Sequence, residues 1–418
     1  MYKRFLILFV LFILFGVTTV TATDGNTGTR DTSWYDNDPS AKIFYISTAD
    51  QLAGLSRIVN SFSGTYESEQ FEGKTIILTK DIDVSVYGSW SPIGIFSSTP
   101  VPTSFRGTFD GNYKKVTGVR ISWGFSGFFG AAEHATIKNL GLVDITVNAE
   151  QVAGGIIGTA INVNIENCYV TGTIKGVYDD FPPVIGGIIG DSYNVSIKNS
   201  YFDGTITASG GHIGGIIGGA LLATIENCYS AGEFTAVGGS YEGSIGGLAN
   251  HINGSIKNSY SVAAIRSENL DLNPAGGIAA NMNGEIINSV ALNPTIESKL
   301  SVARVSESAT LTNTYALADM VLKFEHIDGY AIEDGIDITM PQALTAEFWT
   351  DTLGWDTYIW NIQDGELPTL HHRPPFPPTG VGDMRGSMLL MLALSALSAL
   401  LWTAIFLPRP HHSPTQDG

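Results

Sequence analysis

Two short segments, Gly154-Gly155-Ile156-Ile157-Gly158 and, about a dozen residues later, Ile165-Glu166-Asn167-Cys168-Tyr169, form a two-part signature that repeats along this chain. The first part returns at 186–190 and 214–218, and the second returns around Asn199, Asn227 and Asn258. Weaker copies extend the series to seven asparagines: Asn139, Asn167, Asn199, Asn227, Asn258, Asn288 and Asn313. Successive members are 28, 32, 28, 31, 30 and 25 residues apart. A repeat period of this size indicates a solenoid, a propeller or an array.

The repeat units favour strands over helices. They hold short β-branched runs broken by glycine, and no apolar face with a period near 3.6. A propeller blade needs a longer unit, whereas one coil of a parallel β-helix fits this length. We therefore predict an all-β chain built on a right-handed parallel β-helix with one repeat per coil. A short N-terminal capping helix and a C-terminal transmembrane helix complete the predicted fold.

The position before each asparagine supports one repeat per coil. Its charge alternates along the series Lys138, Glu166, Lys198, Glu226 and Lys257. Stacked coils place equivalent side chains about 4.8 Å apart, where opposite charges attract and like charges repel. The asparagines themselves are predicted to form an inward ladder that hydrogen-bonds between coils. The alternative is that asparagine only marks a solvent-facing turn.

These residues carry a family resemblance. The glycine element followed by Ile-x-Asn-Cys-Tyr or Ile-x-Asn-Ser-Tyr resembles the GLUG-motif repeat of bacterial surface proteins. The run Trp90-Ser91-Pro92-Ile93-Gly94 and the run at 105–112 resemble the usual lead-in to such repeats. The resemblance covers roughly residues 43–370 and implies a cell-surface β-helix, but it names no ligand.

Composition excludes some partners. The chain has 418 residues, with 22 Lys+Arg against 40 Asp+Glu and a net charge of −18. Such an acidic surface argues against nucleic acid and anionic membrane surfaces as partners. The two cysteines, Cys168 and Cys228, fall in one column two coils apart, too far for a disulfide, so both are predicted to be free.

The N-terminus has the features of a secreted protein. Residues 1–22 combine Lys3 and Arg4 with an apolar run and a small-residue exit, which is typical of a signal peptide. Thr48 and Gln51 form a capping-box pattern for a helix over 47–59. We interpret this helix as a cover for the first coil's edges.

The C-terminus has the features of an anchored protein. The motif Phe376, Pro377, Pro378, Thr379 and Gly380 resembles an LPxTG-type sorting signal, and an uncharged span over 388–407 follows it. The resemblance implies cleavage after Thr379 by a sortase-type transpeptidase and linkage to the cell wall. The rival interpretation is a permanent single-pass membrane protein, since 20 uncharged residues are long enough to cross a bilayer.

The predicted organisation follows from these features. Its parts are a signal peptide (1–22), a flexible tail (23–42), a capping helix with the first irregular coils (43–126), the GLUG-type repeats (127–320), a C-terminal cap that seals the last coil (321–370), a Pro/Gly-rich linker with the sorting motif (371–387), the membrane span (388–407) and a cytoplasmic tail (408–418).

Two long turns are the candidate binding sites. They interleave aromatic and acidic residues, which can stack on sugar rings or hold a cation, and could present this surface to a glycan or a host surface protein: Tyr178, Asp179, Asp180, Phe181, Tyr241 and Glu242. The alternative is that turns accept insertions without any function.

No catalytic motif is apparent. The histidines are scattered, and neither His-Glu-x-x-His nor Gly-x-Ser-x-Gly occurs. We therefore expect no cofactor, no metal and no enzymatic activity. The predicted function is that of an adhesin or surface scaffold. The alternatives are a carbohydrate-active β-helix enzyme, that is a polysaccharide lyase or hydrolase, and a passive surface spacer.

Overall fold

A computed structural model describes residues 28–61, 69–95, 103–176, 182–237, 243–268, 274–324 and 329–371. The predicted signal peptide, sorting motif and membrane span lie outside these residues. Within them, no helix is both long enough and apolar enough to cross a membrane.

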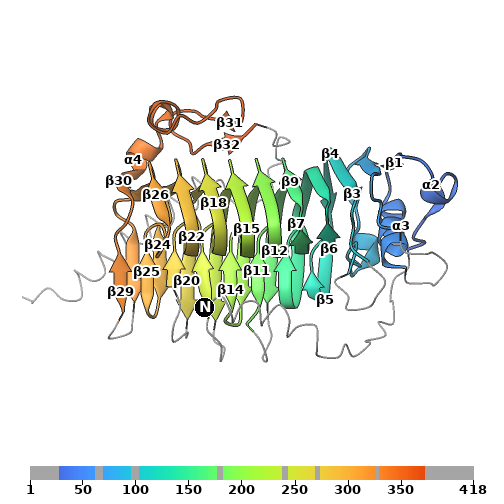
Figure 1. Cartoon of the computed structure of the whole chain (residues 1–418), viewed down its shortest axis with the longest axis horizontal. Helices are drawn as coiled ribbons and strands as arrows, with labels where there is room; N and C mark the ends of the chain where they lie inside the picture. The colour runs from blue at the N-terminus through green and yellow to red at the C-terminus, as the bar shows by residue number, and fades with distance from the viewer. Residues whose placement is uncertain are drawn as a thin grey trace, which may run out of the picture. The chain divides into compact units, whose positions relative to one another are not determined.

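The described chain winds into stacked coils of three parallel strands each (Figure 1). In one coil, β12 (Ile189–Lys198) leads through a turn into β13 (Tyr201–Ala208), and a second turn leads into β14 (His212–Gly214). Neighbouring coils pair in parallel, so β12 pairs with β15 (Ile217–Glu226) and β15 with β18 (Ala249–Lys257). The predicted all-β parallel solenoid is therefore confirmed.

The strands group by their place in the coil. The first side holds, besides β12, β15 and β18, the strands β6 (Phe129–Glu133), β8 (Ile157–Ile161), β9 (Asn164–Glu166), β22 (Ala279–Ile287) and β26 (Thr310–Thr312). The long strand β7 (Thr136–Gly154) runs through all three sides, since it pairs with β9, β10 and β11 in turn. The second side holds, besides β13, the strands β10 (Tyr169–Gly176), β16 (Tyr229–Val237), β19 (Tyr260–Ser261), β20 (Ala264–Glu268), β23 (Val290–Ala291), β24 (Thr295–Ser298), β27 (Tyr315–Leu317), β28 (Val321–Phe324) and β30 (Ile336–Ile338). The third side holds, besides β14, the strands β11 (Val184–Gly186), β17 (Ser244–Gly246), β21 (Pro274–Gly276), β25 (Ser301–Ala303) and β29 (Tyr330–Ile332).

Elements at the two ends complete the chain. The N-terminal ones are α2 (Ser33–Asp36), β1 (Ile43–Ile46), α3 (Ala49–Asn60), β2 (Thr75–Leu78), β3 (Ile82–Asp83), the 3-10 turn η1 (Ser85–Tyr87), β4 (Thr108–Thr117) and β5 (Arg120–Ser126). The C-terminal ones are α4 (Met340–Ala343), the π-helical turn η2 (Phe348–Thr352), β31 (Trp360–Asn361) and β32 (Thr369–Leu370).

Isoleucine columns fill the core. Ile165, Ile197, Ile225 and Ile256 occupy one register position on successive coils, and none exceeds 1% exposure. The charged residues that follow them are in register too, so Lys198 lies between Glu166 and Glu226, with Nζ 2.9 Å from Oε2 of Glu226. The predicted alternating charge column is confirmed.

A left-handed turn follows each charged residue. Asn199, for example, has φ +48°, a backbone conformation that asparagine tolerates better than most residues. Its Nδ2 donates to Oδ1 of Asn167 at 3.2 Å, and its Oδ1 accepts from Nδ2 of Asn227 at 3.1 Å. Asn167 contacts Asn139 and Asn313 contacts Asn288 in the same way.

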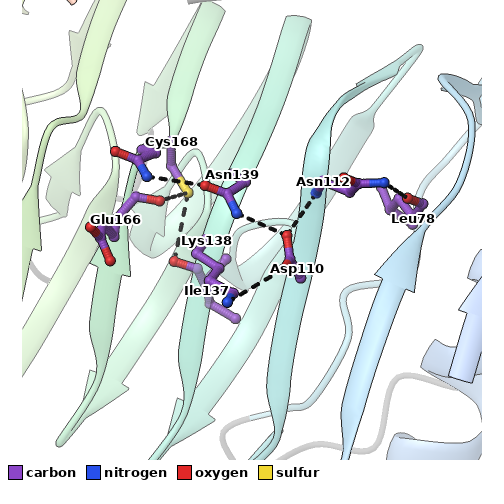
Figure 2. A network of polar contacts seen from close by, with 9 residues as sticks. Leu78, Asp110, Asn112, Ile137, Lys138, Asn139, Glu166 and Cys168 are labelled. Carbon is purple, nitrogen blue, oxygen red and sulfur yellow. Dashed lines mark hydrogen bonds and ion pairs between the residues drawn. The ribbon is translucent and has the colours of Figure 1, made fainter. Parts of the chain in front are cut away.

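Asp110 ends both columns at the N-terminal side (Figure 2). Its Oδ1 accepts from Nδ2 of Asn139 at 3.0 Å, and its Oδ2 lies 3.4 Å from Nζ of Lys138. One carboxylate therefore satisfies the first amide of the ladder and the first cation of the charge column. Cys168 and Cys228 are free and buried, as predicted.

The N-terminal region is more ordered than predicted. Helix α3 begins after Thr48, whose side chain accepts from the Gln51 N–H, while Gln51 Oε1 accepts from the Ser47 N–H. The prediction of a flexible tail over 23–42 is wrong for its described part. The rings of Trp34 and Tyr35 in α2 pack on the Phe44 ring, with centroid distances of 5.3 and 5.6 Å. Together these rings cover the first coil.

The C-terminal segment does not seal the last coil, so that expectation is wrong. Strands β28 to β30 continue the coils as far as Ile338, and 339–371 then folds back along their side (Figure 1). There Trp349, Trp355 and Trp360 pack on Tyr260, and its hydroxyl donates to the Pro368 carbonyl at 2.8 Å.

A tyrosine column explains this position. Tyr169, Tyr201, Tyr229 and Tyr260 stack with ring centroids 5.2, 4.6 and 5.1 Å apart and nearly parallel planes. Such rings present a large apolar face, whose burial is favourable. The three tryptophans contact the C-terminal end of this column, so they cover the flank of the inner coils.

Replacing Asn199 tests the ladder. Asn199→Leu should lower the free energy of unfolding by about 2 kcal/mol, because it removes two side-chain hydrogen bonds and strains the left-handed turn. Asn199→Gly keeps the turn relaxed and should cost only about 1 kcal/mol. Urea unfolding followed by circular dichroism measures both. Equal losses for the two variants would show that the amide contacts and not the turn conformation dominate.

Candidate functional site

Three titratable side chains gather outside the core, where the third side of the coil meets the first. Asp191, Gly219 and His251 occupy one register position on three successive coils. His212 and Ser244 are neighbours on the adjacent strands β14 and β17. We call Asp191, His212, Ser244, Asn250 and His251 the polar cluster.

The glycine elements create this cluster. Each element bends the chain sharply. Residues on the outer face of the strand before the bend therefore lie near residues on the outer face of the strand after it. Gly219 leaves room at the centre, because a Cβ there would lie 3.1 Å from Oδ1 of Asp191 and 3.4 Å from Cγ1 of Val184. A larger residue at 219 would therefore displace the Asp191 carboxyl.

Hydrogen bonds fix the orientation of His212. Ser244 Oγ donates to Asn250 Oδ1 at 3.0 Å, and Asn250 Nδ2 donates to the Ser244 carbonyl. Since the Ser244 hydrogen is engaged, the 3.3 Å contact between His212 Nδ1 and Ser244 Oγ has Nδ1 as donor. The neutral ring then has Nε2 as its acceptor.

Burial shifts all three titrating groups toward their neutral forms. It raises the pKa of Asp191 to about 6. The Ser192 N–H, which donates to Asp191 Oδ1 at 2.9 Å, has the smaller and opposite effect of lowering that pKa. Burial, and then the nearby His251 ring, lower the pKa of His212 to about 4. Burial also lowers the pKa of His251. Near neutral pH the cluster therefore offers neutral imidazoles and a carboxyl that titrates close to pH 6.

The cluster is not a Ser-His-Asp triad. Ser244 receives a hydrogen bond from His212, so the ring does not serve as its base in this arrangement. Among the described residues, no group of three His, Cys, Asp or Glu side chains has the geometry to hold a metal ion. The arrangement offers hydrogen-bond donors and acceptors, and one carboxyl that can exchange a proton.

The predicted binding turns cannot be placed. Tyr178, Asp179, Asp180, Phe181, Tyr241 and Glu242 all lie outside the described residues, as does the sorting motif 376–380. The described residues that flank these turns stack closely, since a Cβ on Gly211 would lie 2.2 Å from the Pro183 carbonyl and one on Gly243 2.0 Å from the Gly211 carbonyl. His212 and Ser244 come directly after Gly211 and Gly243, at this edge of the coils.

Sequence reasoning missed the polar cluster, although the repeats contained a signal. The residue directly after each five-residue glycine element is Thr159, Asp191, Gly219, His251 or Asn281, and these share one column. Aligning that position across the repeats would have placed Asp191 and His251 together.

The sequence model of the GLUG motif matches residues 150–175 and 209–235. Each match spans one glycine element and the asparagine turn that follows it. The chain therefore carries GLUG repeats, as the resemblance predicted. Among curated proteins, none matches the chain.

Two solved structures are similar in fold. One is a Bacteroides ovatus protein provisionally assigned as an immunoglobulin A1 protease, with 18% identity and a TM-score of 0.49 over 79% of this chain and 92% of the other. The second is described as an IgA1 protease, with 15% identity and a TM-score of 0.49 over 81% of this chain and 26% of the other. The chain thus spans about a quarter of that protein.

The prediction that the chain has no enzymatic activity is contradicted by these two structures, because both are described as proteases. We withdraw it. At these identities and TM-scores, the likeness transfers no activity, substrate or site to this chain.

Replacing Asp191 tests the buried carboxyl. Its folded pKa of about 6 exceeds the ordinary value of 3.8, so the folded state binds its proton more tightly, and stability is lost as pH rises through about 6. Asp191→Asn should therefore be more stable than the parent at pH 7, by roughly 1–3 kcal/mol. The difference should vanish near pH 4. Thermal unfolding from pH 4 to pH 7 measures it, and a constant difference across this range would refute the assignment.

Proposed function

We propose that the chain is a cell-surface β-helix protein that binds glycans at the polar cluster and acts as an adhesin or surface scaffold. The observation that carries this proposal is the cluster itself, where Asp191, His212 and His251 lie half-buried on the outer side of stacked coils. Groups with perturbed pKa values at one place are candidates for function. A carboxyl, two neutral imidazoles and serine and asparagine side chains are suited to the hydroxyl groups of a sugar.

The rigid scaffold supports the same proposal. Outward residues on a parallel β-helix repeat every strand spacing, about 4.8 Å, along a straight column. A sugar chain that runs along the axis could contact Asp191 and His251 at once, since their positions are two spacings apart. We also infer that the coils are right-handed, the sense that crossovers between parallel strands almost always take.

A glycan array probed with the full chain tests the binding. A triple variant with Asp191→Asn, His212→Gln and His251→Gln should bind any glycan found on the array at least tenfold more weakly, because its hydrogen-bonding groups are altered. Glu233→Gln, an exposed change on β16 of the same coils, is the matched control and should change binding less than twofold. An array without hits would overturn glycan binding and favour the passive spacer, and hits limited to host proteins would favour a protein ligand.

One observation favours a second candidate, a carbohydrate-active enzyme. A carboxyl with a pKa near 6 is suited to general acid catalysis on a glycosidic bond. Reducing ends released from a bound polysaccharide by the parent, but not by Asp191→Asn, would establish this reading over simple binding.

Surface attachment is a separate part of the proposal. We infer from the sequence that the motif at 376–380 is cut after Thr379 and that the new carboxyl end is linked to the cell wall. The prolines support this, since they keep the peptide extended, as a transpeptidase groove requires. The rival is a protein that keeps the 388–407 span in the membrane.

The mass of the mature protein and the treatment that extracts it from cells distinguish sortase processing from a retained membrane span. Sortase processing removes Gly380 to Gly418 and gives a protein released by wall-degrading enzymes but not by detergent. Thr379→Ala should abolish wall linkage, whereas Ser387→Ala outside the motif should have no effect. Mature protein that retains residues 388–407 and leaves with detergent would exclude wall linkage.

A further inference from the structure

The last coil ends in three strands that each pair on one side only within the described chain. Strand β28 pairs with β24, β29 with β25 and β30 with β27. They lie at the C-terminal end of the stack, where Figure 1 labels β29 and β30. At the other end, α3 lies over the first coils, and its Leu52, Leu55, Ile58 and Val59 are fully buried. Among the described strands at that end, β1 also pairs on one side only, with β2, but Trp34 of α2 packs on its Phe44 with ring centroids 5.3 Å apart. The C-terminal end is therefore the less covered of the two edges.

The direction of the free backbone groups follows from the bonds already made. The N–H groups of Val321, Tyr330 and Ile336 donate inward, to the carbonyls of Pro294, Leu300 and Thr314. Alternate residues of a parallel strand bond to opposite sides. The backbone N–H and C=O groups of Leu322, Ala331 and Asp337 therefore point outward, along the axis of the coils.

Apolar side chains surround this edge. Val321, Phe324, Tyr330 and Ile336 are each between 43% and 52% exposed, although they are large and hydrophobic. A mainly polar cavity of about 620 Å³ lies beside this edge, with Met320 and Leu322 in its wall next to Arg304, Glu333 and Asp337. Large exposed apolar residues beside unpaired strand edges are typical of sites that accept another strand.

The charges around the cavity are acidic. Arg304 lines it but is engaged, because its guanidinium donates to Asp337 Oδ1 at 2.6 Å and to the carbonyls of Asp334 and Gly335. Glu333 is exposed in the same wall, and Asp337 keeps most of its side chain exposed. Asp319 is exposed beside it. An incoming strand with cationic side chains would complement this rim.

We propose that the C-terminal edge of the β-helix binds an extended, cationic and apolar segment of another protein, which adds a strand to the last coil. A second copy of this chain fits less well. Tail-to-tail contact brings the same acidic rims together, and head-to-tail contact would have to reach β1, on which Trp34 and Tyr35 of α2 already pack. Main-chain bonds to the groups of Leu322, Ala331 and Asp337 would supply affinity, and the acidic rim would select cationic side chains.

A synthetic peptide of about eight residues, the usual length range of a strand, with alternating lysine and valine, tests this on the full chain by fluorescence anisotropy. The parent should bind it, and the same peptide with glutamate for lysine should bind at least tenfold more weakly. N-methylation of alternate peptide groups should also weaken binding tenfold, because it removes the donors of one edge. Absence of binding by the parent, or equal binding of the N-methylated peptide, overturns the proposal.

Two variants locate the site. Ala331→Pro removes one outward N–H and leaves the inward bond of Tyr330 intact, so it should weaken binding about tenfold. Glu333→Lys keeps the backbone and should weaken binding at least fivefold, with less dependence on salt. Glu150→Lys, an exposed change of the same charge on β7, is the control and should have less than a twofold effect. Equal effects of Glu333→Lys and Glu150→Lys would mean non-specific attraction and overturn the proposal.

Sedimentation velocity checks the rival occupant. The parent should be monomeric without peptide. A dimer that dissociates in Ala331→Pro would assign the edge to a second copy of this chain and overturn the proposal.

Discussion

The hydrogen bond between asparagine side chains of successive coils is the contact on which this solenoid most depends. Each repeat must turn from one side of the coil to the next within one or two residues after its charged position, and the left-handed conformation of asparagine provides that turn. Because the amide both donates and accepts, Asn167 and Asn199 are each bonded to the turn before and the turn after, and Asn227 is bonded to Asn199. The position of every turn thereby fixes the register of both strands that join there, and with it the direction of each outward side chain.

The outer features follow from this fixed register. Tyrosines two residues after the asparagines stack into a column because their coils cannot slip, and the column then binds the tryptophans of the C-terminal segment. Similarly, residues directly after the glycine elements come together as the polar cluster. Neither feature is encoded within one repeat, since each requires several coils at a constant spacing.

The parts of the fold that could be predicted are those that a single repeat already contains. The isoleucines, the asparagine turn and the alternating charge are local and periodic, so sequence reasoning found them. The position of the C-terminal segment was predicted wrongly, because it depends on a contact between Tyr260 and residues about 100 positions later. The polar cluster was missed because Asp191 and His251 stand two repeats apart, with only Gly219 between them. The absence of enzymatic activity was inferred from missing motifs, and motifs do not describe chemistry that a fold brings together from separate coils.

The alternating column of Lys198, Glu226 and Lys257 has a consequence for how such a chain can change length. A single added or deleted coil would set two like charges face to face, whereas a pair of coils would preserve the alternation. Cysteine and serine alternate with the same parity, and the Cys168 N–H donates to the Ser200 hydroxyl on the next coil, as the Cys228 N–H does to Ser259. When repeats of this solenoid are duplicated or lost, changes of two coils at a time are therefore favoured over changes of one coil. The two-coil unit is the inherited building block.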